Sequence, residues 1–143
     1  MGQQQLLLLV LGVVLVGLAI VAGLGAYASA QQAALEDIRR NKMVDYATQA
    51  QAWKRLHPMR GGQPDAWRSD PDSFEGFEVA KIGLTPVRVS GTVEHVETAV
   101  GCFRLDHGAS GIDIHALEPG CDDATESLHL RVRGVEAGDL SWP

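Results

Sequence analysis

The sequence predicts an α+β protein in which a long N-terminal α-helix packs on a small C-terminal antiparallel β-sheet. Three observations carry this prediction. An unbroken apolar run fills Leu6 to Gly25, and apolar residues at helical spacing continue from there towards Pro58. After Pro86, apolar and polar residues alternate with a period of two in four short segments, which is typical of strands with one buried face. The predicted helix is apolar on all sides in its first half and amphipathic in its second half.

The apolar run is long enough to cross a membrane. Its 20 residues carry no polar side chain, and the first charged residue of the chain is Glu36. At about 1.5 Å per residue such a helix spans the roughly 30 Å hydrocarbon layer of a bilayer. Glycine is unfavourable in a soluble helix but common in membrane helices, and the run contains Gly12, Gly17, Gly23 and Gly25.

A cleavable secretory signal is the alternative interpretation of the same run. Ala28-Ser29-Ala30 before Gln31 has the small residues of a signal peptidase site. The missing basic residues before the run and its length, beyond the usual 7–15 apolar residues of a signal, oppose this alternative. Cleavage after Ala30 would release a secreted soluble domain.

The amphipathic second half of the helix is expected to cover the sheet. Its apolar residues recur at helical spacing, and charged residues occupy the other faces. Pro58, followed by Gly61-Gly62, supplies the end of the helix. We therefore predict an N-terminal helical region over 1–57, of which 1–30 spans a membrane or forms a filament core. The apolar positions expected on the sheet are Leu35, Ile38, Met43, Tyr46, Ala50 and Trp53.

For the rest of the chain we predict a connecting loop over 58–72 and a β-rich globular surface domain over 73–143. The loop is rich in proline and turn-forming residues. The segment Phe74–Leu84 is ambiguous between strand and loop. The last residues are expected to add a short edge strand, with Trp142 capping the core. The alternating strand positions are Val87, Val89, Gly91 and Val93; Phe103 and Leu105; Ile112 and Ile114; and Leu128, Leu130 and Val132.

The two cysteines, Cys102 and Cys121, most simply form one disulfide if the domain faces an oxidising compartment. Two unpaired thiols are the alternative. A cross-link over a loop of this length contributes roughly 3 kcal/mol. A domain this small is marginally stable alone, so the cross-link is expected to matter.

The residues give no reason to expect catalysis. No nucleophile motif or phosphate-binding glycine loop occurs, so we expect no enzyme, no catalytic residue and no cofactor. The net charge of −6 argues against a nucleic-acid partner. We also expect no metal site, because no pair of ligand residues has a recurring spacing, and we interpret Asp122-Asp123 as a solvated turn. The histidines weighed in that expectation are His57, His95, His107, His115 and His129.

The layout resembles type IV pilins and pilin-like filament subunits. These share an apolar N-terminal helix that runs into an amphipathic half, followed by a small β-rich body with one cysteine pair near the C-terminus. The resemblance implies that apolar helices bundle into the core of an extracellular filament while the bodies face outward. It also implies insertion in the inner membrane before assembly, a cell-surface location, and identical subunits in a helical homopolymer as partners.

The processing signals of that family are only partly present here. Gly2 is a possible processing site, which would make Gln3 the first residue of the mature chain. Family members carry a glutamate five residues into the mature chain, but no acidic residue precedes Glu36. Counted from Met1, Gln5 stands at that place, where it can accept a hydrogen bond but cannot form an ion pair.

Physical arguments from the residues favour polymerisation as well. Buried glutamine amides need hydrogen-bond partners, which sister helices supply. A repeated head-to-tail contact between identical chains generates an open helical polymer. The alternative is a monomeric, single-pass membrane-anchored surface binding protein. The residues expected to mediate assembly are Gln3, Gln4, Gln5, Gly12, Gly17 and Gly23.

Overall fold

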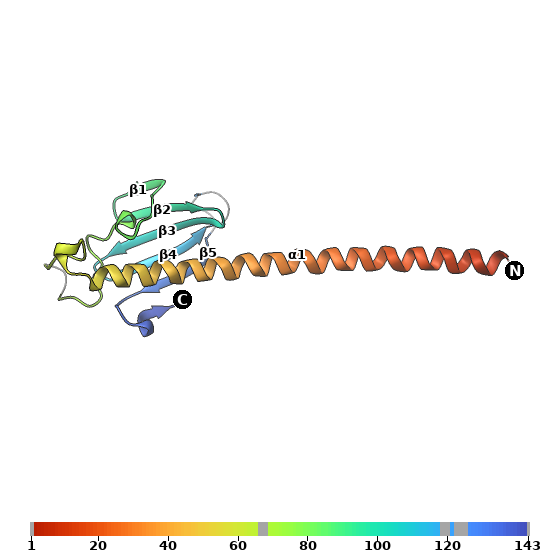
Figure 1. Cartoon of the computed structure of the whole chain (residues 1–143), viewed down its shortest axis with the longest axis horizontal. Helices are drawn as coiled ribbons and strands as arrows, with labels where there is room; N and C mark the ends of the chain where they lie inside the picture. The colour runs from red at the N-terminus through yellow and green to blue at the C-terminus, as the bar shows by residue number, and fades with distance from the viewer. Residues whose placement is uncertain (1, 66–68, 118–120, 122–125, 143) are drawn as a thin grey trace. The chain divides into compact units, whose positions relative to one another are not determined.

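The structure is a computed structural model that describes residues 2–65, 69–117, 121 and 126–142. It contains one 54-residue helix, α1 (Gly2–Arg55), and one six-stranded antiparallel sheet (Figure 1). The predicted α+β class is therefore confirmed. The chain divides by its internal contacts into two compact units, residues 1–37 and residues 38–143, and the sheet belongs to the second. The domain boundaries predicted at residues 57 and 72 stay predictions.

Helix α1 ends where the sequence supplies its stop signals. Two residues beyond its end, His57 Nδ1 accepts a hydrogen bond from the backbone amide of Met59 and so caps a short 3₁₀ helix, η1 (Pro58–Arg60). Proline at the first position of η1 has no amide hydrogen that needs a partner. Gly61 then takes a left-handed conformation with φ of 82°, which reverses the chain.

The C-terminal part of α1 buries one face in the second unit. The buried positions repeat with helical spacing, so they form a single stripe. Leu35 and Ile38 were expected on this stripe but are 45% and 43% exposed, so the packed segment begins later than predicted. The buried residues are Met43, Tyr46, Ala47, Ala50, Gln51, Trp53 and Lys54.

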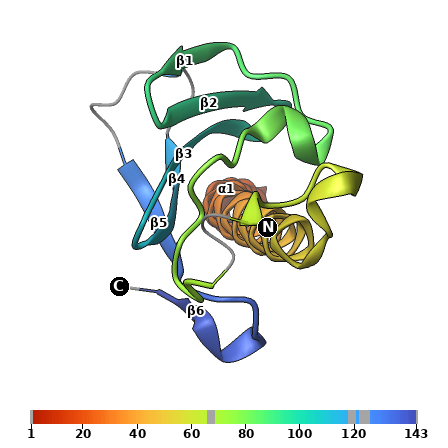
Figure 2. The same cartoon turned by 90° about the vertical axis from the view of Figure 1, so that its left-hand side faces the viewer.

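The sheet is a meander in which every strand pairs with its neighbour in sequence (Figure 2). Only two to eight residues separate consecutive strands, which explains the antiparallel order, because a parallel pairing needs a long crossover. Its strands are β1 (Arg88–Ser90), β2 (Val93–Thr98), β3 (Gly101–Gly108), β4 (Gly111–Leu117), β5 (Glu126–Val132) and β6 (Leu140–Ser141).

The first predicted strand is in fact a hairpin. The shared parity of Val87, Val89, Gly91 and Val93 predicted one continuous strand, which is wrong. Strands β1 and β2 are joined by Gly91 and Thr92, and Ser90 pairs with Val93 across the turn. Gly91 has φ of 64°, a value that glycine adopts freely at the first position of a two-residue hairpin loop. Val89 consequently lies on an exposed edge strand, and Val87 just before that strand is exposed as well.

The core lies between α1 and one face of the sheet. Alternate residues of β3 and β4 point into it, and the ring of Phe103 meets Tyr46 of α1 edge to face at 5.3 Å. The ambiguous segment before β1 is not a strand: Phe74 and Phe77 insert their rings into the core, and η2 (Val79–Ile82) follows as a 3₁₀ helix. Phe77 contacts Trp53 edge to face at 5.3 Å, so this segment closes the end of the core.

A buried lysine ties the connecting segment to α1. Lys54 Nζ donates hydrogen bonds to the backbone carbonyls of Asp70 (3.1 Å), Pro71 and Ser73 (2.7 Å). The ammonium also lies 4.5 Å from the centre of the Phe74 ring. Burial lowers the pKa of Lys54, and the nearby carboxylates of Asp70 and Asp72 oppose that change. This one side chain therefore orders backbone that has no regular secondary structure of its own.

The predicted edge strand at the C-terminus is present as β6, but Trp142 does not cap the core. Its side chain is 46% exposed, and the guanidinium of Arg40 lies 5.8 Å from the centre of its ring. A cation beside an exposed indole is a surface interaction of modest strength. The prediction for Trp142 is therefore wrong.

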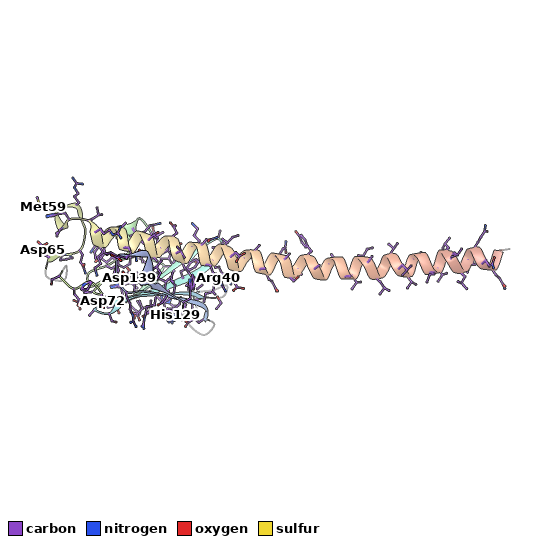
Figure 3. The ribbon with its side chains drawn as sticks, turned by 90° about the horizontal axis from the view of Figure 1, so that it is seen from below. Arg40, Met59, Asp65, Asp72, His129 and Asp139 are labelled. Carbon is purple, nitrogen blue, oxygen red and sulfur yellow. A yellow bond between two sulfur atoms is a disulfide. The ribbon has the colours of Figure 1, made fainter. Side chains whose placement is uncertain are left out.

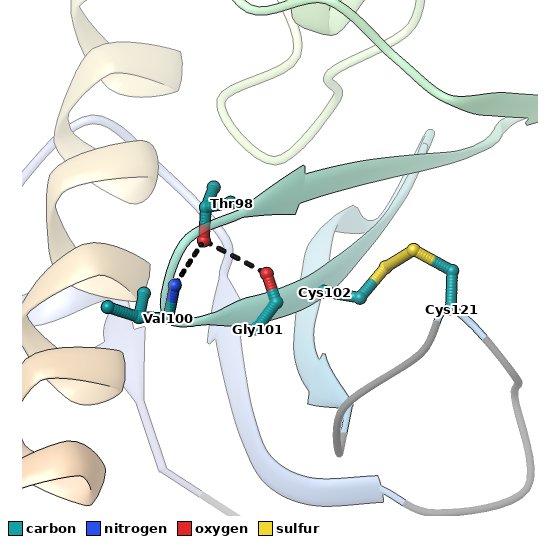
Figure 4. The surroundings of a disulfide bond; sticks show 5 residues. All are labelled: Thr98, Val100, Gly101, Cys102 and Cys121. Atoms are coloured by element: carbon teal, nitrogen blue, oxygen red, sulfur yellow. Dashed lines mark hydrogen bonds between the residues drawn. A yellow bond between two sulfur atoms is a disulfide. The ribbon is translucent and has the colours of Figure 1, made fainter.

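The predicted disulfide joins Cys102 of β3 to Cys121, with the two Cα atoms 5.3 Å apart (Figure 4). The turn that precedes β3 is held by Thr98. Its hydroxyl donates to the carbonyl of Gly101 at 2.9 Å and accepts from the amide of Val100 at 3.4 Å. The cross-link ties the start of β3 to the connection between β4 and β5.

Candidate assembly surface and a polar cluster on the sheet

The apolar half of α1 exposes its side chains on all sides. Every residue from Gly2 to Ile38 is exposed, and the large aliphatic side chains between Leu6 and Leu24 are 50–69% exposed. The helix is long and apolar enough to cross a membrane. Soluble monomers rarely expose an apolar surface of this extent. Lipid or other protein chains must therefore cover it.

The predicted assembly glycines are not packed against any other element in the part of the chain that the structure describes. A Cβ atom added at Gly12, Gly17 or Gly23 would meet no atom within 4 Å. Glycine in a helix interior is about 1 kcal/mol less favourable than alanine. Close packing among the described residues therefore does not offset the lower helix stability that these glycines cause. Open surface at a glycine is what a closely approaching second helix requires.

The two ends of the apolar run carry polar side chains. Gln3, Gln4 and Gln5 are exposed on the first turns of α1. At the other end, Gln31 Nε2 donates a 2.9 Å hydrogen bond to the hydroxyl oxygen of Tyr27. Tyrosine is enriched where a membrane helix leaves the hydrocarbon layer, since its ring is apolar and its hydroxyl is polar. The polar ends thus bracket an apolar surface. Gly2, the possible processing site, begins α1.

The outer face of the sheet, opposite the core, carries a row of basic and imidazole side chains. The strand registers align four residues side by side: His95 with Arg104, Arg104 with His115, and His115 with His129. Among the other histidines, His57 caps η1, and His107 points to the core side, where its ring lies 5.7 Å from Phe77. The structure thus gathers three of the five histidines in one row.

His115 and His129 stand directly opposite each other on β4 and β5. Their rings stack at 4.2 Å between centres with an interplanar angle of 16°. Glu126 is hydrogen-bonded to His115 Nδ1, and His129 Nε2 lies 2.8 Å from Asp113 Oδ1. His129 is labelled in Figure 3. The cluster therefore pairs each imidazole with its own carboxylate.

Two guanidinium groups complete the charge pattern of this cluster. Arg131 binds Asp113 through both carboxylate oxygens, each at 2.8 Å. Arg104 approaches Glu126 at 3.7 Å. Burial alone raises the pKa of Asp113, but its hydrogen bonds from Arg131 and His129 outweigh this and lower it. Burial lowers the pKa of His115, although Glu126 opposes that shift.

Sequence reasoning missed Glu126 for a structural reason. Period-two alternation along β5 puts Glu126 on the core face with Leu128. A register irregularity changes this: Ala116 pairs with Leu128, whereas Leu117 pairs with Glu126. Such a bulge adds one residue to a strand and shifts the facing of what precedes it. Only a prediction of the bulge would have placed Glu126 beside the histidines. Asp122-Asp123 lies outside the described residues.

Comparisons of the chain with protein-family models, with curated proteins and with solved structures find no match.

Proposed function

We propose that this chain is the structural subunit of an extracellular, pilus-like filament and that it polymerises through the apolar half of α1. The observation that carries the proposal is the exposed apolar helix, in which Gly12, Gly17 and Gly23 are packed against by none of the described residues. A bilayer covers the helix before assembly, and helices of identical subunits cover it afterwards. The role is structural rather than enzymatic.

The glycine positions favour a protein neighbour over lipid alone. Fluid lipid chains form contacts of similar strength with a helix whether or not it carries a glycine. A second helix, in contrast, can bring its backbone closer at a glycine and so forms more van der Waals contacts there. Gln3, Gln4 and Gln5 are exposed on the first turns of the same helix and offer amides that pair between adjacent helices. In the proposed filament these residues form the subunit contacts, and the disulfide-bonded sheet is the outer surface.

The disulfide supports an extracytoplasmic location for the second unit. Disulfides persist in oxidising compartments such as the periplasm and the cell exterior. The apolar helix and the cross-link are both consistent with a chain that is inserted in a membrane and carries its sheet outside the cytoplasm. A monomeric anchored protein shares these features, so the discriminating property is contact between copies of the apolar helix.

Site-specific photocross-linking tests that contact. A benzophenone amino acid at Val14, in the apolar run, is irradiated in intact cells and compared with the same probe at Met59, which is exposed outside the run. The proposal expects a ladder of covalent multimers from the Val14 probe and none from the Met59 probe. Irradiated Val14 chains that remain entirely monomeric would contradict polymerisation through this helix and favour the anchored monomer.

A further inference from the structure

The stacked histidines and Glu126 bring three metal-ligating side chains to one point of the outer sheet face. One ligand atom from each of His115, Glu126 and His129 lies within 4.8 Å of the others. A tetrahedral Zn²⁺ ion at about 2.1 Å from its ligands needs separations of about 3.4 Å between them. Closing the cluster from its present spacing requires the side chains to move closer together, and one of the two nearly parallel imidazoles must rotate to direct its lone pair at a shared ion.

We propose that His115, Glu126 and His129 bind a divalent transition-metal ion of the Zn²⁺ class. Two imidazole nitrogens and one carboxylate oxygen suit Zn²⁺, Cu²⁺ and Ni²⁺, and they suit Ca²⁺ or Mg²⁺ poorly, since those ions prefer oxygen ligands throughout. Three protein ligands leave a fourth position open to water. This inference does not depend on filament formation, because all three residues belong to one chain.

Cross-strand pairing pre-organises the two imidazoles. His115 and His129 occupy directly opposed positions on β4 and β5, so their rings leave the sheet in the same direction. Cβ atoms at opposed positions lie about 5 Å apart, which leaves two imidazoles able to share one ion. Backbone hydrogen bonds to the neighbouring strands fix the positions of both residues. The two side chains therefore lose little conformational entropy when an ion binds.

The carboxylate of Asp113 orients His129. Its Nε2 donates to Asp113 Oδ1 when the imidazole is neutral, which leaves Nδ1 with the lone pair that a metal needs. Asp113 is itself fixed by the two hydrogen bonds from Arg131. A carboxylate behind a ligating histidine is the usual arrangement at metal centres, and the carboxylate fixes the tautomer and the orientation of the ring.

Glu126 is the adjustable ligand. Its side chain is 40% exposed, so its carboxylate can turn from its present partners towards an ion without opening the core. Those partners are His115 Nδ1 and, at 3.7 Å, Arg104. Among the described residues, the charged groups that contact the cluster or Asp113 beside it are Glu126 and Arg131 from β5, Asp113 from β4 and Arg104 from β3. Arg104 competes with the ion for Glu126 and weakens its binding.

This proposal departs from the expectation of no metal site. That expectation rested on spacing along the chain, in which His115, Glu126 and His129 form no recurring motif. The sheet brings them together through the register of two strands and one bulge. Neither feature is visible as a sequence spacing.

The test uses the full chain, purified without a histidine tag in detergent and stripped with a chelator. Co²⁺ is titrated while its visible absorption is followed, because tetrahedral Co²⁺ absorbs far more strongly than hexahydrated Co²⁺, and Zn²⁺ is then added as a competitor. We expect one Co²⁺ per chain, displaced by Zn²⁺. Glu126→Gln and His129→Gln are each expected to weaken binding at least about tenfold. The matched control, His57→Asn, removes an exposed histidine elsewhere and is expected to bind like the wild type.

Two further readouts keep the result decisive. Glu126 and Arg104 lie on the outer face, so their variants are expected to show the wild-type thermal transition in the presence of chelator. Arg104→Met is expected to tighten Co²⁺ binding severalfold, since it removes the competing cation. Wild-type chain without a tetrahedral Co²⁺ spectrum, Glu126→Gln with wild-type affinity, or Arg104→Met without a gain would each overturn the assignment.

Discussion

The ring of Tyr46 on α1 meets the ring of Phe103 on β3 edge to face, with 5.3 Å between centres and planes 86° apart. This contact joins the helix to the middle of the sheet. Phe103 is fully buried, and its neighbours on the core face of β4 are buried as well. The second unit is small, so a single contact of this kind carries a large share of its stability.

Phe103→Ala is therefore expected to lower the free energy of unfolding by about 3–5 kcal/mol, because it leaves a cavity beneath α1. Urea unfolding of the oxidised full chain in detergent, followed by near-UV circular dichroism, measures the change. Val89→Ala on the exposed strand β1 is the control and is expected to stay within about 0.5 kcal/mol of the wild type. Equal effects of the two changes would contradict the position of the core.

Removal of the disulfide by the double change Cys102→Ala and Cys121→Ala is expected to cost roughly 3 kcal/mol of stability. The cross-link restricts the unfolded chain, so its loss acts on the unfolded state. The same urea experiment with and without reductant gives the test. Reductant is expected to destabilise the wild type and to leave the double variant unchanged; a wild type indifferent to reductant would mean that the bond contributes nothing.

The stability of the second unit is expected to fall as the pH drops below about 6.5. Burial against Phe77 lowers the pKa of His107, although Glu94, Asp106 and Glu78 oppose the shift and Lys81 adds to it. The folded state then binds fewer protons than the unfolded state, so the contribution is complete above pH 6.5 and is lost as the pH falls towards the lower, folded pKa. The pKa of His115 is shifted in the same direction.

His107→Gln is expected to flatten this dependence between pH 7 and pH 5, because it removes one of the two histidines whose pKa is lowered by burial. The unfolding free energy at several pH values in this interval provides the measurement. Val89→Ala on the exposed strand β1, which removes no titratable group, is the control and is expected to keep the wild-type slope. A His107→Gln curve parallel to that of the wild type would show that His107 does not couple to folding.

Gly17→Leu is expected to abolish or strongly reduce filaments while the second unit folds normally. A Cβ atom at this position meets no atom of the described residues within 4 Å, whereas a leucine side chain would separate two closely packed helices. Filament yield is measured by electron microscopy of sheared cells, and folding by disulfide formation and circular dichroism. Val21→Leu, a change between two large apolar residues of the same run, is the control. Wild-type yield with Gly17→Leu would rule out tight packing at that residue.

The helix and the fold class were predictable because their signals are local and strong. The apolar run and the following helical spacing predicted α1 to within a few residues of its observed bounds. The stop at Pro58 and the disulfide also followed from residue types alone. Alternation in β3, in β4 and in β5 from Leu128 onward correctly separated the core side chains from the outer ones.

The remaining features depend on tertiary context. Gly91 fits the parity of a strand, yet its freedom at positive φ makes it the turn of a hairpin. Trp142 is large and apolar, but it follows the last residue of β6 and stays 46% exposed beside Arg40, while Leu140 of β6 is the residue that packs against the core. Glu126 reaches the histidines only through a bulge, and the row of His95, Arg104, His115 and His129 depends on register across four strands. Register is set by pairing, which sequence spacing does not display.

The filament proposal is tested most directly by the mass and the N-terminal residue of this chain in material sheared mechanically from intact cells without detergent. The account predicts a chain that begins at Met1 or Gln3 and so retains the apolar run, because the helix leaves the membrane inside a polymer. A chain that begins at Gln31, or a full-length chain that stays in the membrane fraction until detergent is added, would contradict it.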